Sequence, residues 1–287
     1  MDWQRMRRSQ NVEYRNDRRA FGGRAGIGIG GFIVVLVLGW LMGVNPLSLL
    51  SMLQEEGGNG PLSRVQTELP PNNQNTEFVR AILGDTEDTW GAIFQRSGQS
   101  YEEPRLVLFS GTVQSACGFA SAAVGPFYCS RDEEVYLDLS FFEELSQRFG
   151  APGDFARAYV IAHEVGHHIQ HLLGISARIQ AQRIRADAVT SNALSVRQEL
   201  QADCFAGVWG HYTAKRGLVD RADIAAALNA AAQIGDDRLQ KRAQGYVVPE
   251  AFTHGSAAQR VQWFKKGLES GNPDQCNTFT ADTAGQF

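Results

Sequence analysis

The sequence has no excess of positive charge and no internal repeat. Its 27 Lys and Arg residues are outnumbered by 31 Asp and Glu residues, which gives a formal net charge of −4. An acidic chain lacks the basic surface through which proteins bind nucleic acid, so we expect no nucleic-acid partner. The apolar content of 43% and the charged content of 20% are those of a globular protein, and 287 residues suffice for one sizeable domain with additional segments.

Charge is missing altogether from residues 25–54. The apolar part of this gap, residues 25–44, is long enough to cross a bilayer as a helix, for which about 20 residues suffice. A cleaved signal peptide has a shorter apolar core and a small-residue cleavage site, which this stretch lacks. Residues 1–24 carry seven arginines against three acidic residues. Because basic flanks stay in the cytoplasm, we predict a single-pass anchor at 25–44 and a cytoplasmic leader at 1–24.

Two further segments follow the predicted anchor. Residues 45–76 are rich in Gly, Pro, Asn and Gln, which predicts a linker, and residues 77–287 are predicted to form one domain outside the cytoplasm. Glycines spaced by four allow close approach of helices in lipid, so a homodimer formed through the anchor is a further expectation. The alternative is a span that is merely rich in glycine. These glycines are Gly22, Gly26, Gly30, Gly39 and Gly43.

Cysteine is scarce, and all four cysteines follow the predicted anchor. Disulfides persist outside the cytoplasm, so this placement agrees with the predicted topology. Of the pairings that four cysteines allow, we predict Cys117–Cys129 and Cys204–Cys276. The alternative is that free thiols act as additional metal ligands.

The apolar spacing predicts a mainly helical α+β domain. Residues 77–97 have helical spacing, and residues 106–109 and 135–139 are strand-like. A looped hairpin between these strands is either an ordinary structural element or a strand edge that holds an extended substrate. Helices dominate afterwards, and their predicted starts are Asp154, Ser195, Asp220 or Asp223, and Ser256.

The motif His163-Glu-Val-Gly-His167 has the pattern H-E-x-x-H. Residues four apart lie on one face of a helix, so both imidazoles can bind one metal ion, and zinc accepts such ligands. Glu164 lies about 100° round the helix from His163, which places it to act on water as a general base. The flanking residues are apolar, and a buried cluster of this kind has to be paired or metal-bound.

A second motif, Glu199-Leu-Gln-Ala-Asp203, supplies the carboxylates that the first lacks. A catalytic zinc takes three protein ligands, and we predict Glu199 as the third. Asp203 shares its helix face and is expected to accept a hydrogen bond from a ligand histidine. The sequence does not match the pattern H-E-x-x-H-x-x-G-x-x-H, in which a third histidine is the ligand, because Gln170 and Leu173 occupy its glycine and last histidine positions. His168 and His171, on the same helix, are predicted to be packing or surface residues.

With both motifs in place, the chain resembles a bacterial family of membrane-anchored proteins named putative neutral zinc metallopeptidases. The likeness covers nearly the whole chain. It is carried by Ser115-Ala-Cys-Gly118, Gly125-Pro-Phe-Tyr-Cys129, Val135-Tyr-Leu-Asp138, Ala158-Tyr-Val-Ile-Ala-His-Glu-Val-Gly-His-His168, Glu199-Leu-Gln-Ala-Asp-Cys204, Ile234-Gly-Asp-Asp237, Phe252-Thr-His-Gly255, and Gln259-Arg260 with Trp263-Phe264.

The resemblance implies a zincin-like metallopeptidase domain that binds one zinc ion and cleaves a peptide or protein substrate at the bacterial inner membrane, on its periplasmic side. It implies His163, His167 and Glu199 as ligands and Glu164 as catalyst. Zincins of this type often have a further residue that stabilises the oxyanion, and His254 is the candidate; the alternative is a loop histidine that caps a backbone carbonyl. A non-enzymatic zinc-binding scaffold and a hydrolase of non-peptide amides in the cell wall are the competing functions.

Overall fold

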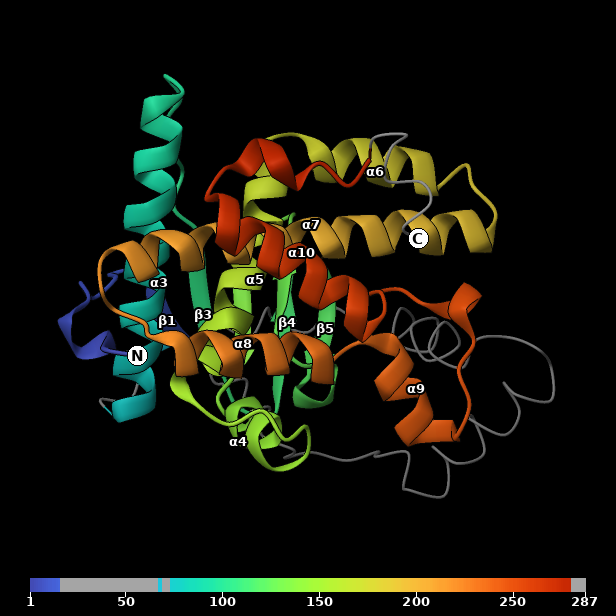
Figure 1. Cartoon of the computed structure of the whole chain (residues 1–287), viewed down its shortest axis with the longest axis horizontal. Coiled ribbons are helices and arrows are strands. Elements are labelled where there is room, and N and C mark those ends of the chain that lie inside the picture. Colours follow the sequence, from blue (N-terminus) through green and yellow to red (C-terminus); the bar gives the residue numbers. More distant parts are fainter. Residues whose placement is uncertain (16–66, 69–72, 280–287) are drawn as a thin grey trace, which may run out of the picture. The chain divides into compact units, whose positions relative to one another are not determined.

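The structure is a computed structural model, and it describes residues 1–15, 67–68 and 73–279. Helices dominate this part of the chain, together with two small sheets, as predicted for a mainly helical α+β domain (Figure 1). The predicted membrane span, residues 25–44, and its glycines lie outside the described residues. Within the described ranges, no helix is long and apolar enough to cross a membrane.

The larger sheet has five strands in the order β2-β1-β3-β7-β6. β1, β3 and β7 run parallel, while β2 and β6 pair antiparallel at its two edges. The smaller sheet is the antiparallel hairpin β4–β5. The strands are β1 (Val12–Arg15), β2 (Thr67–Glu68), β3 (Arg105–Phe109), β4 (Thr112–Ser115), β5 (Gly118–Ser121), β6 (Phe127–Cys129) and β7 (Glu134–Asp138).

Each face of the larger sheet packs against a different layer. Successive strand residues point to opposite faces, so Leu106 of β3 joins the main core with the helices, whereas Val107 packs with Val113 of the β4–β5 hairpin. The disulfide Cys117–Cys129, predicted from the sequence, connects this hairpin to β6. Among the described strands, β6 has a partner on one side only, which is β7.

The helices supply most of the main core and surround the metal-binding motifs. They are α3 (Gln74–Arg96), α4 (Ser140–Gln147), α5 (Asp154–Leu172), α6 (Ile175–Arg183), α7 (Ala188–Lys215), α8 (Arg221–Gln233), α9 (Asp236–Gln244) and α10 (Ala257–Ser270), with the short turns η1 (Trp3–Arg5), η2 (Ala122–Val124), η3 (Pro249–Ala251) and η4 (Pro273–Cys276).

Of the four predicted helix starts, Asp220 and Ser256 are confirmed as N-caps, Ser195 is wrong, and α5 begins at Asp154 with Gly153 as its N-cap. Asp220 and Ser256 form capping boxes at the starts of α8 and α10. Ser195 lies inside α7, which begins about two turns earlier, where Asp187 is the N-cap. The Ser195 hydroxyl donates instead to the carbonyl oxygen of Ser191 at 3.2 Å, a bond that serines make within helices.

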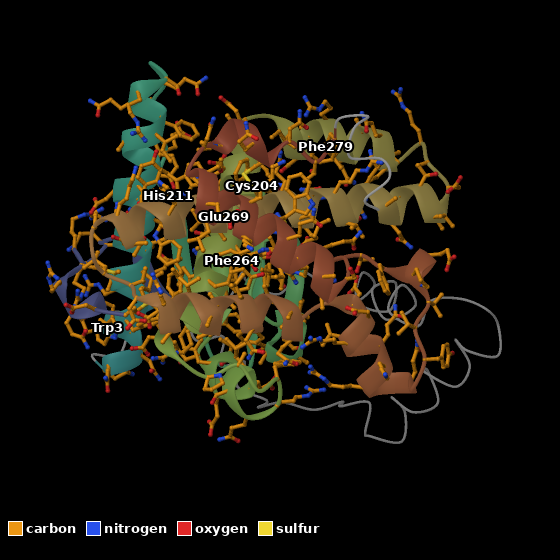
Figure 2. The ribbon with its side chains drawn as sticks, in the orientation of Figure 1. Trp3, Cys204, His211, Phe264, Glu269 and Phe279 are labelled. Carbon is orange, nitrogen blue, oxygen red and sulfur yellow. A yellow bond between two sulfur atoms is a disulfide. The ribbon has the colours of Figure 1, made fainter. Side chains whose placement is uncertain are left out.

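The α7 and α10 helices lie in backbone contact. A Cβ atom at Gly207 would lie 2.1 Å from the carbonyl oxygen of Phe264, and one at Gly267 would lie 1.9 Å from that of Cys204. Only glycine permits this approach, so each helix contributes one glycine to the crossing. The predicted disulfide Cys204–Cys276 then joins α7 to η4, and its sulfur is visible at Cys204 in Figure 2.

The N-terminal residues are an integral part of the domain. The Trp3 side chain is 5% exposed and lies edge-on to Phe78 of α3, with the ring centroids 5.6 Å apart (Figure 2 labels Trp3). Its Nε1 donates to Asp154, the first residue of α5, which therefore binds Trp3 rather than capping the helix as predicted. The ammonium group of Met1 forms an ion pair with Asp223 at 2.6 Å.

The position of β1 corrects the predicted organisation of the chain. β1 lies between β2 and β3, and Arg15 donates two hydrogen bonds to Glu134 of β7. Strands that share backbone hydrogen bonds lie on the same side of a membrane. A single membrane crossing by residues 25–44 would separate β1 from β3, whereas residues 1–15 of the predicted cytoplasmic leader 1–24 pack with the domain. The predicted linker also ends earlier than residue 76, because α3 begins at Gln74.

The burial of Trp3 can be tested by mutation. We expect Trp3→Ala to lower the free energy of unfolding of the full-length chain by about 3–5 kcal/mol, because it removes a core ring and leaves a cavity. Gln4→Ala, at an exposed neighbouring position, should change it by less than about 0.5 kcal/mol. Denaturant titration in detergent measures both. Equal, small effects of the two substitutions would show that residues 1–15 are not packed in the core.

Candidate metal centre

The centre forms where α5 crosses α7 at close range. A Cβ atom at Gly166, the fourth residue of the H-E-x-x-H motif, would lie 2.9 Å from the carbonyl oxygen of Ala202 on α7. Glycine therefore allows the two helices to meet at this point. Because Gly166 precedes His167 and Ala202 precedes Asp203, the crossing places the histidines of α5 opposite the carboxylates of α7.

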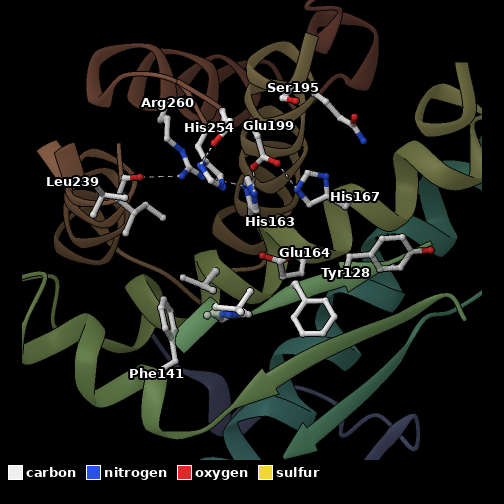
Figure 3. Close-up of a pocket in the computed structure, with 18 of the residues that line it drawn as sticks. Tyr128, Phe141, His163, Glu164, His167, Ser195, Glu199, Leu239, His254 and Arg260 are labelled. Carbon is white, nitrogen blue, oxygen red and sulfur yellow. Dashed lines mark hydrogen bonds and ion pairs between the residues drawn. The ribbon is translucent and has the colours of Figure 1, made fainter. Parts of the chain in front are cut away.

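Three side chains converge on one point of this crossing. His163 Nε2 lies 3.1 Å from Glu199 Oε2, and His167 Nε2 lies 3.4 Å from Glu199 Oε1 (Figure 3). One ligand atom from each residue lies within 4.8 Å of the other two. Imidazole nitrogens and a carboxylate oxygen are donors that zinc accepts. The structure thus brings together the three residues predicted as ligands and shows that they can hold a metal ion.

The other ring nitrogen of each histidine is already bonded to protein. His163 Nδ1 lies 2.8 Å from Asp203 Oδ1, and His167 Nδ1 lies 2.9 Å from Gln170 Oε1. The carboxylate oxygen of Asp203 can only accept. The amide oxygen of Gln170 accepts as well, because the amide nitrogen donates to Gln198 O at 2.7 Å and so fixes the orientation of the amide. Each Nδ1 therefore carries the proton, and each Nε2 offers its lone pair to a metal ion.

The carboxylate of Asp203 is fully buried, and hydrogen bonds from two other helices satisfy it. It accepts from the Tyr159 hydroxyl and the His163 ring of α5, and Arg260 of α10 donates to it from Nε at 2.8 Å and from Nη2 at 2.9 Å. Burial raises the pKa of Asp203, but Arg260 and His163 outweigh burial and lower it to about 2. Asp203 therefore stays charged at neutral pH and holds the His163 ring.

Negative charge surrounds the two histidines. Burial lowers the pKa of His163, but Asp203 and Glu199 raise it to about 10. Burial opposes the charged form of His167 as well, yet Glu199 raises its pKa. The pKa of Glu199 lies well below its usual value, because the two histidines outweigh its burial. These shifts have one common cause: the cluster favours a cation, either a proton or a metal ion, between the Nε2 atoms and Glu199.

The centre opens onto a cavity of about 770 Å³. Glu164, which is 7% exposed, lines this cavity together with His163, His167 and Glu199. Figure 3 shows the Glu164 carboxylate beside the histidines on the side of the cavity. A carboxylate in this position can accept a proton from a water molecule that lies at the metal.

His254 reaches the same cavity from the loop before α10. The carboxylate of Asp236 holds this loop, because Oδ2 accepts the backbone N–H groups of Thr253 at 2.7 Å, His254 at 2.6 Å and Gly255 at 3.1 Å. Its Oδ1 lies 3.2 Å from His254 Nδ1. This hydrogen bond is the main cause that raises the pKa of His254, whose side chain is 52% exposed, and Glu199 adds to it.

His168 and His171 lie outside the metal cluster, as their helical positions predict. His168 is buried, and its Nε2 donates to the carbonyl oxygen of Glu102 at 2.7 Å. Its Nδ1 must therefore accept from the Tyr128 hydroxyl at 3.0 Å, and burial lowers its pKa. His171 lies 3.4 Å from Glu133 at the surface. Tyr128, which lines the cavity, has its only hydroxyl proton engaged by His168 and has none to donate to a substrate.

The sequence did not reveal three residues that organise the centre. Gln170 is considered there only as the residue at a position where a third-histidine pattern needs glycine, and Asp236 only as part of the Ile234-Gly-Asp-Asp237 motif. Arg260 gave one signal that was available: it shares a helical face with Trp263 and Phe264, which are buried. A charge on an apolar face at this spacing indicates a buried ion pair, although the sequence does not identify its partner.

The comparisons with known proteins agree with this geometry. The family described as "Putative neutral zinc metallopeptidase" matches residues 1–279, a range that includes the packed N-terminal residues. The "Uncharacterized protein YpfJ" of Escherichia coli is 46% identical over 294 residues, which cover 97% of this chain and 99% of that protein. The "Uncharacterized protein Rv2575" of Mycobacterium tuberculosis is 42% identical over 262 residues, which cover 85% and 86%. No solved structure matches the chain. The chain therefore belongs to the family named "Putative neutral zinc metallopeptidase".

Proposed function

We propose that this chain is a zinc metallopeptidase that hydrolyses peptide bonds with Glu164 as general base. The observation that carries the proposal is the convergence of His163, His167 and Glu199, whose ligand atoms lie within 4.8 Å of one another. Glu164 lines the cavity onto which these ligands open. A purely structural zinc site needs neither a base nor an open cavity, which disfavours a non-enzymatic scaffold.

The donor set fits one zinc ion. Structural zinc sites are closed by four protein ligands, whereas catalytic sites have three and keep one position open. Two imidazoles with protonated Nδ1 atoms and one carboxylate are a set of the second kind. Zinc held by these three residues would lower the pKa of a water molecule toward about 7 and would polarise the scissile carbonyl.

The protein's own residues then handle the protons. Glu164 accepts the proton of the attacking water and passes it to the leaving nitrogen. Asp203 and Gln170 keep His163 and His167 in the tautomer that binds metal. His254, held by Asp236, donates a hydrogen bond to the oxygen that becomes negative in the transition state; its raised pKa favours the protonated, donating form.

The cavity wall favours a polypeptide over a non-peptide amide of the cell wall. β6, one of the two edge strands of the larger sheet, lines the cavity through Phe127 and Tyr128. An extended peptide can add to such an edge through backbone hydrogen bonds, which a non-peptide amide cannot repeat along its length.

The domain is proposed to act outside the cytoplasm, at the bacterial inner membrane. Its two disulfides support this location, because disulfides persist in oxidising compartments. Residues 25–44 remain the proposed membrane attachment. Because β1 is paired with β3, residues 1–15 and the domain are proposed to lie on one side of the membrane, so residues 25–44 would enter it from that side rather than cross it once. Homodimerisation through the glycines of residues 22–43 stays a prediction.

Glu164→Gln tests the base. We expect the zinc-loaded variant to keep one zinc ion and to lose cleavage of a mixed peptide library, because an amide cannot accept the proton. Mass spectrometry of the products and of the metal content measures both. The matched control is Glu143→Gln, which makes the same change at an exposed position of α4, and this variant should cleave normally. Undiminished cleavage by Glu164→Gln would rule out the proposed role, and cleavage of cell-wall fragments alone would favour the non-peptide amidase.

Gln170→Leu tests the support of His167. We expect zinc affinity to fall by about 10–100-fold, as is typical when a partner of a ligand histidine is lost. The control Gln180→Leu, at an exposed position of α6, should leave the affinity unchanged. Competition with a fluorescent chelator measures the dissociation constants. Equal affinities of the two variants would show that Gln170 does not position His167.

The raised pKa of His163 predicts that zinc competes with protons. At a pKa of about 10 the ring is protonated at pH 7, so zinc binding must release at least one proton. Zinc affinity should therefore rise with pH, about tenfold per unit for each proton released. Calorimetry in buffers of different ionisation enthalpy counts the protons. An affinity that does not change between pH 6 and pH 8 would contradict this electrostatic account.

A further inference from the structure

The two ends of the cavity differ in chemistry. At one end, α4, α5 and α9 with their flanking loops contribute mainly apolar side chains, whereas α6 and α7 contribute Ser176, Arg183 and Gln198 at the other. Figure 3 shows Phe141 and Leu239 to one side of Glu164, and Tyr128 on the other side. The apolar lining consists of Phe141, Phe149, Val160, Ile234, Leu239 and Ala243.

Several of these apolar side chains are incompletely covered by the domain. Phe141, Phe149 and Leu239 are half-buried, although each lines a concave surface. Phe141 lies beside Gly125, where a Cβ atom would be 3.6 Å from its ring, and Gly125 leads into β6. The apolar end is therefore continuous with the strand edge proposed to hold the substrate backbone.

The apolar end is also bounded. Two guanidinium groups lie near the ring of Phe149, with Arg148 5.6 Å and Arg242 5.6 Å from its centroid. Phe149 in turn lies 6.4 Å from the Phe141 ring. Cations beside Phe149 limit how far an apolar ligand can extend, so the space suits one large side chain rather than a long hydrocarbon chain.

We propose that this end of the cavity is a specificity subsite for a large apolar side chain, such as Phe or Leu, on the substrate residue next to the scissile bond. The inference rests on the proposed peptidase function and adds the substrate class to it. The occupant is part of the substrate, because the same cavity contains Glu164 and the metal ligands. Burying such a side chain between Phe141 and Leu239 removes apolar surface of both partners from water.

The experiment uses the zinc-loaded full-length chain in detergent. Cleavage positions in a mixed peptide library should share a large apolar residue at one fixed position beside the cut. For two peptides that differ only there, kcat/KM with Phe should exceed that with Ala by at least about tenfold. Equal values for the two peptides would overturn the subsite while leaving the peptidase function intact.

Two variants locate the preference in the structure. Leu239→Asp should bring the Phe-to-Ala ratio of kcat/KM close to one, because a carboxylate then faces the apolar side chain. Ala243→Trp should lower the ratio by filling the space without adding charge. Lys241→Gln is the matched control: it changes the net charge as Leu239→Asp does, lies exposed on the same helix outside the cavity lining, and should keep the wild-type ratio.

The outcomes separate this inference from the function on which it rests. A ratio that Leu239→Asp and Ala243→Trp leave unchanged would place the preference elsewhere and overturn the subsite alone. Absence of cleavage of every library peptide by the zinc-loaded wild type would overturn the peptidase function and the subsite together. Retained zinc binding in each variant shows that it is folded.

Discussion

The buried charge of Asp203 is the constraint on which the centre depends. A carboxylate removed from water costs several kcal/mol unless charged and polar partners surround it, and here the partners come from two other helices. His163 and Tyr159 come from α5, Arg260 from α10, and Asp203 itself from α7. Glycines at the α5–α7 and α7–α10 crossings bring these helices close enough for such bonds. The geometry that satisfies the charge is therefore the geometry that aligns the metal ligands.

Sequence reasoning found the parts of the fold that local periodicity encodes, such as the capped helices after Asp220 and Ser256. It failed where a long-range partner decides the structure. β1 has four residues, and two of them are charged, so nothing local marks it as a strand inside a sheet. Its pairing with β3 connects residues about 90 positions apart. At Ser195 the error is of another kind: the residues from Ser195 have the spacing of a capping box, but they lie inside the longer helix α7 and do not begin a helix.

The site divides in the same way. His163, Glu164 and His167 follow from the helical period, and Glu199 and Asp203 from the same spacing on a second helix. Their supporting residues are scattered over α5, α9 and α10, and a single sequence holds no relation between them. Gln170 is an example. In the sequence it stands where the three-histidine pattern needs glycine and so argues against that type of metal site, whereas in the structure it orients His167.

The pairing of Met1 with Asp223 makes the packing of the N-terminal residues depend on segments that come much later in the chain. Met1 is held by a partner more than two hundred residues later in the chain, and β1 cannot pair until β3 is present. Contacts this distant in sequence form slowly, because the intervening chain must first be ordered. Trp3 has no core to pack in until α3 and α5 are present. The beginning of this chain is thus among the last parts of the domain to fold.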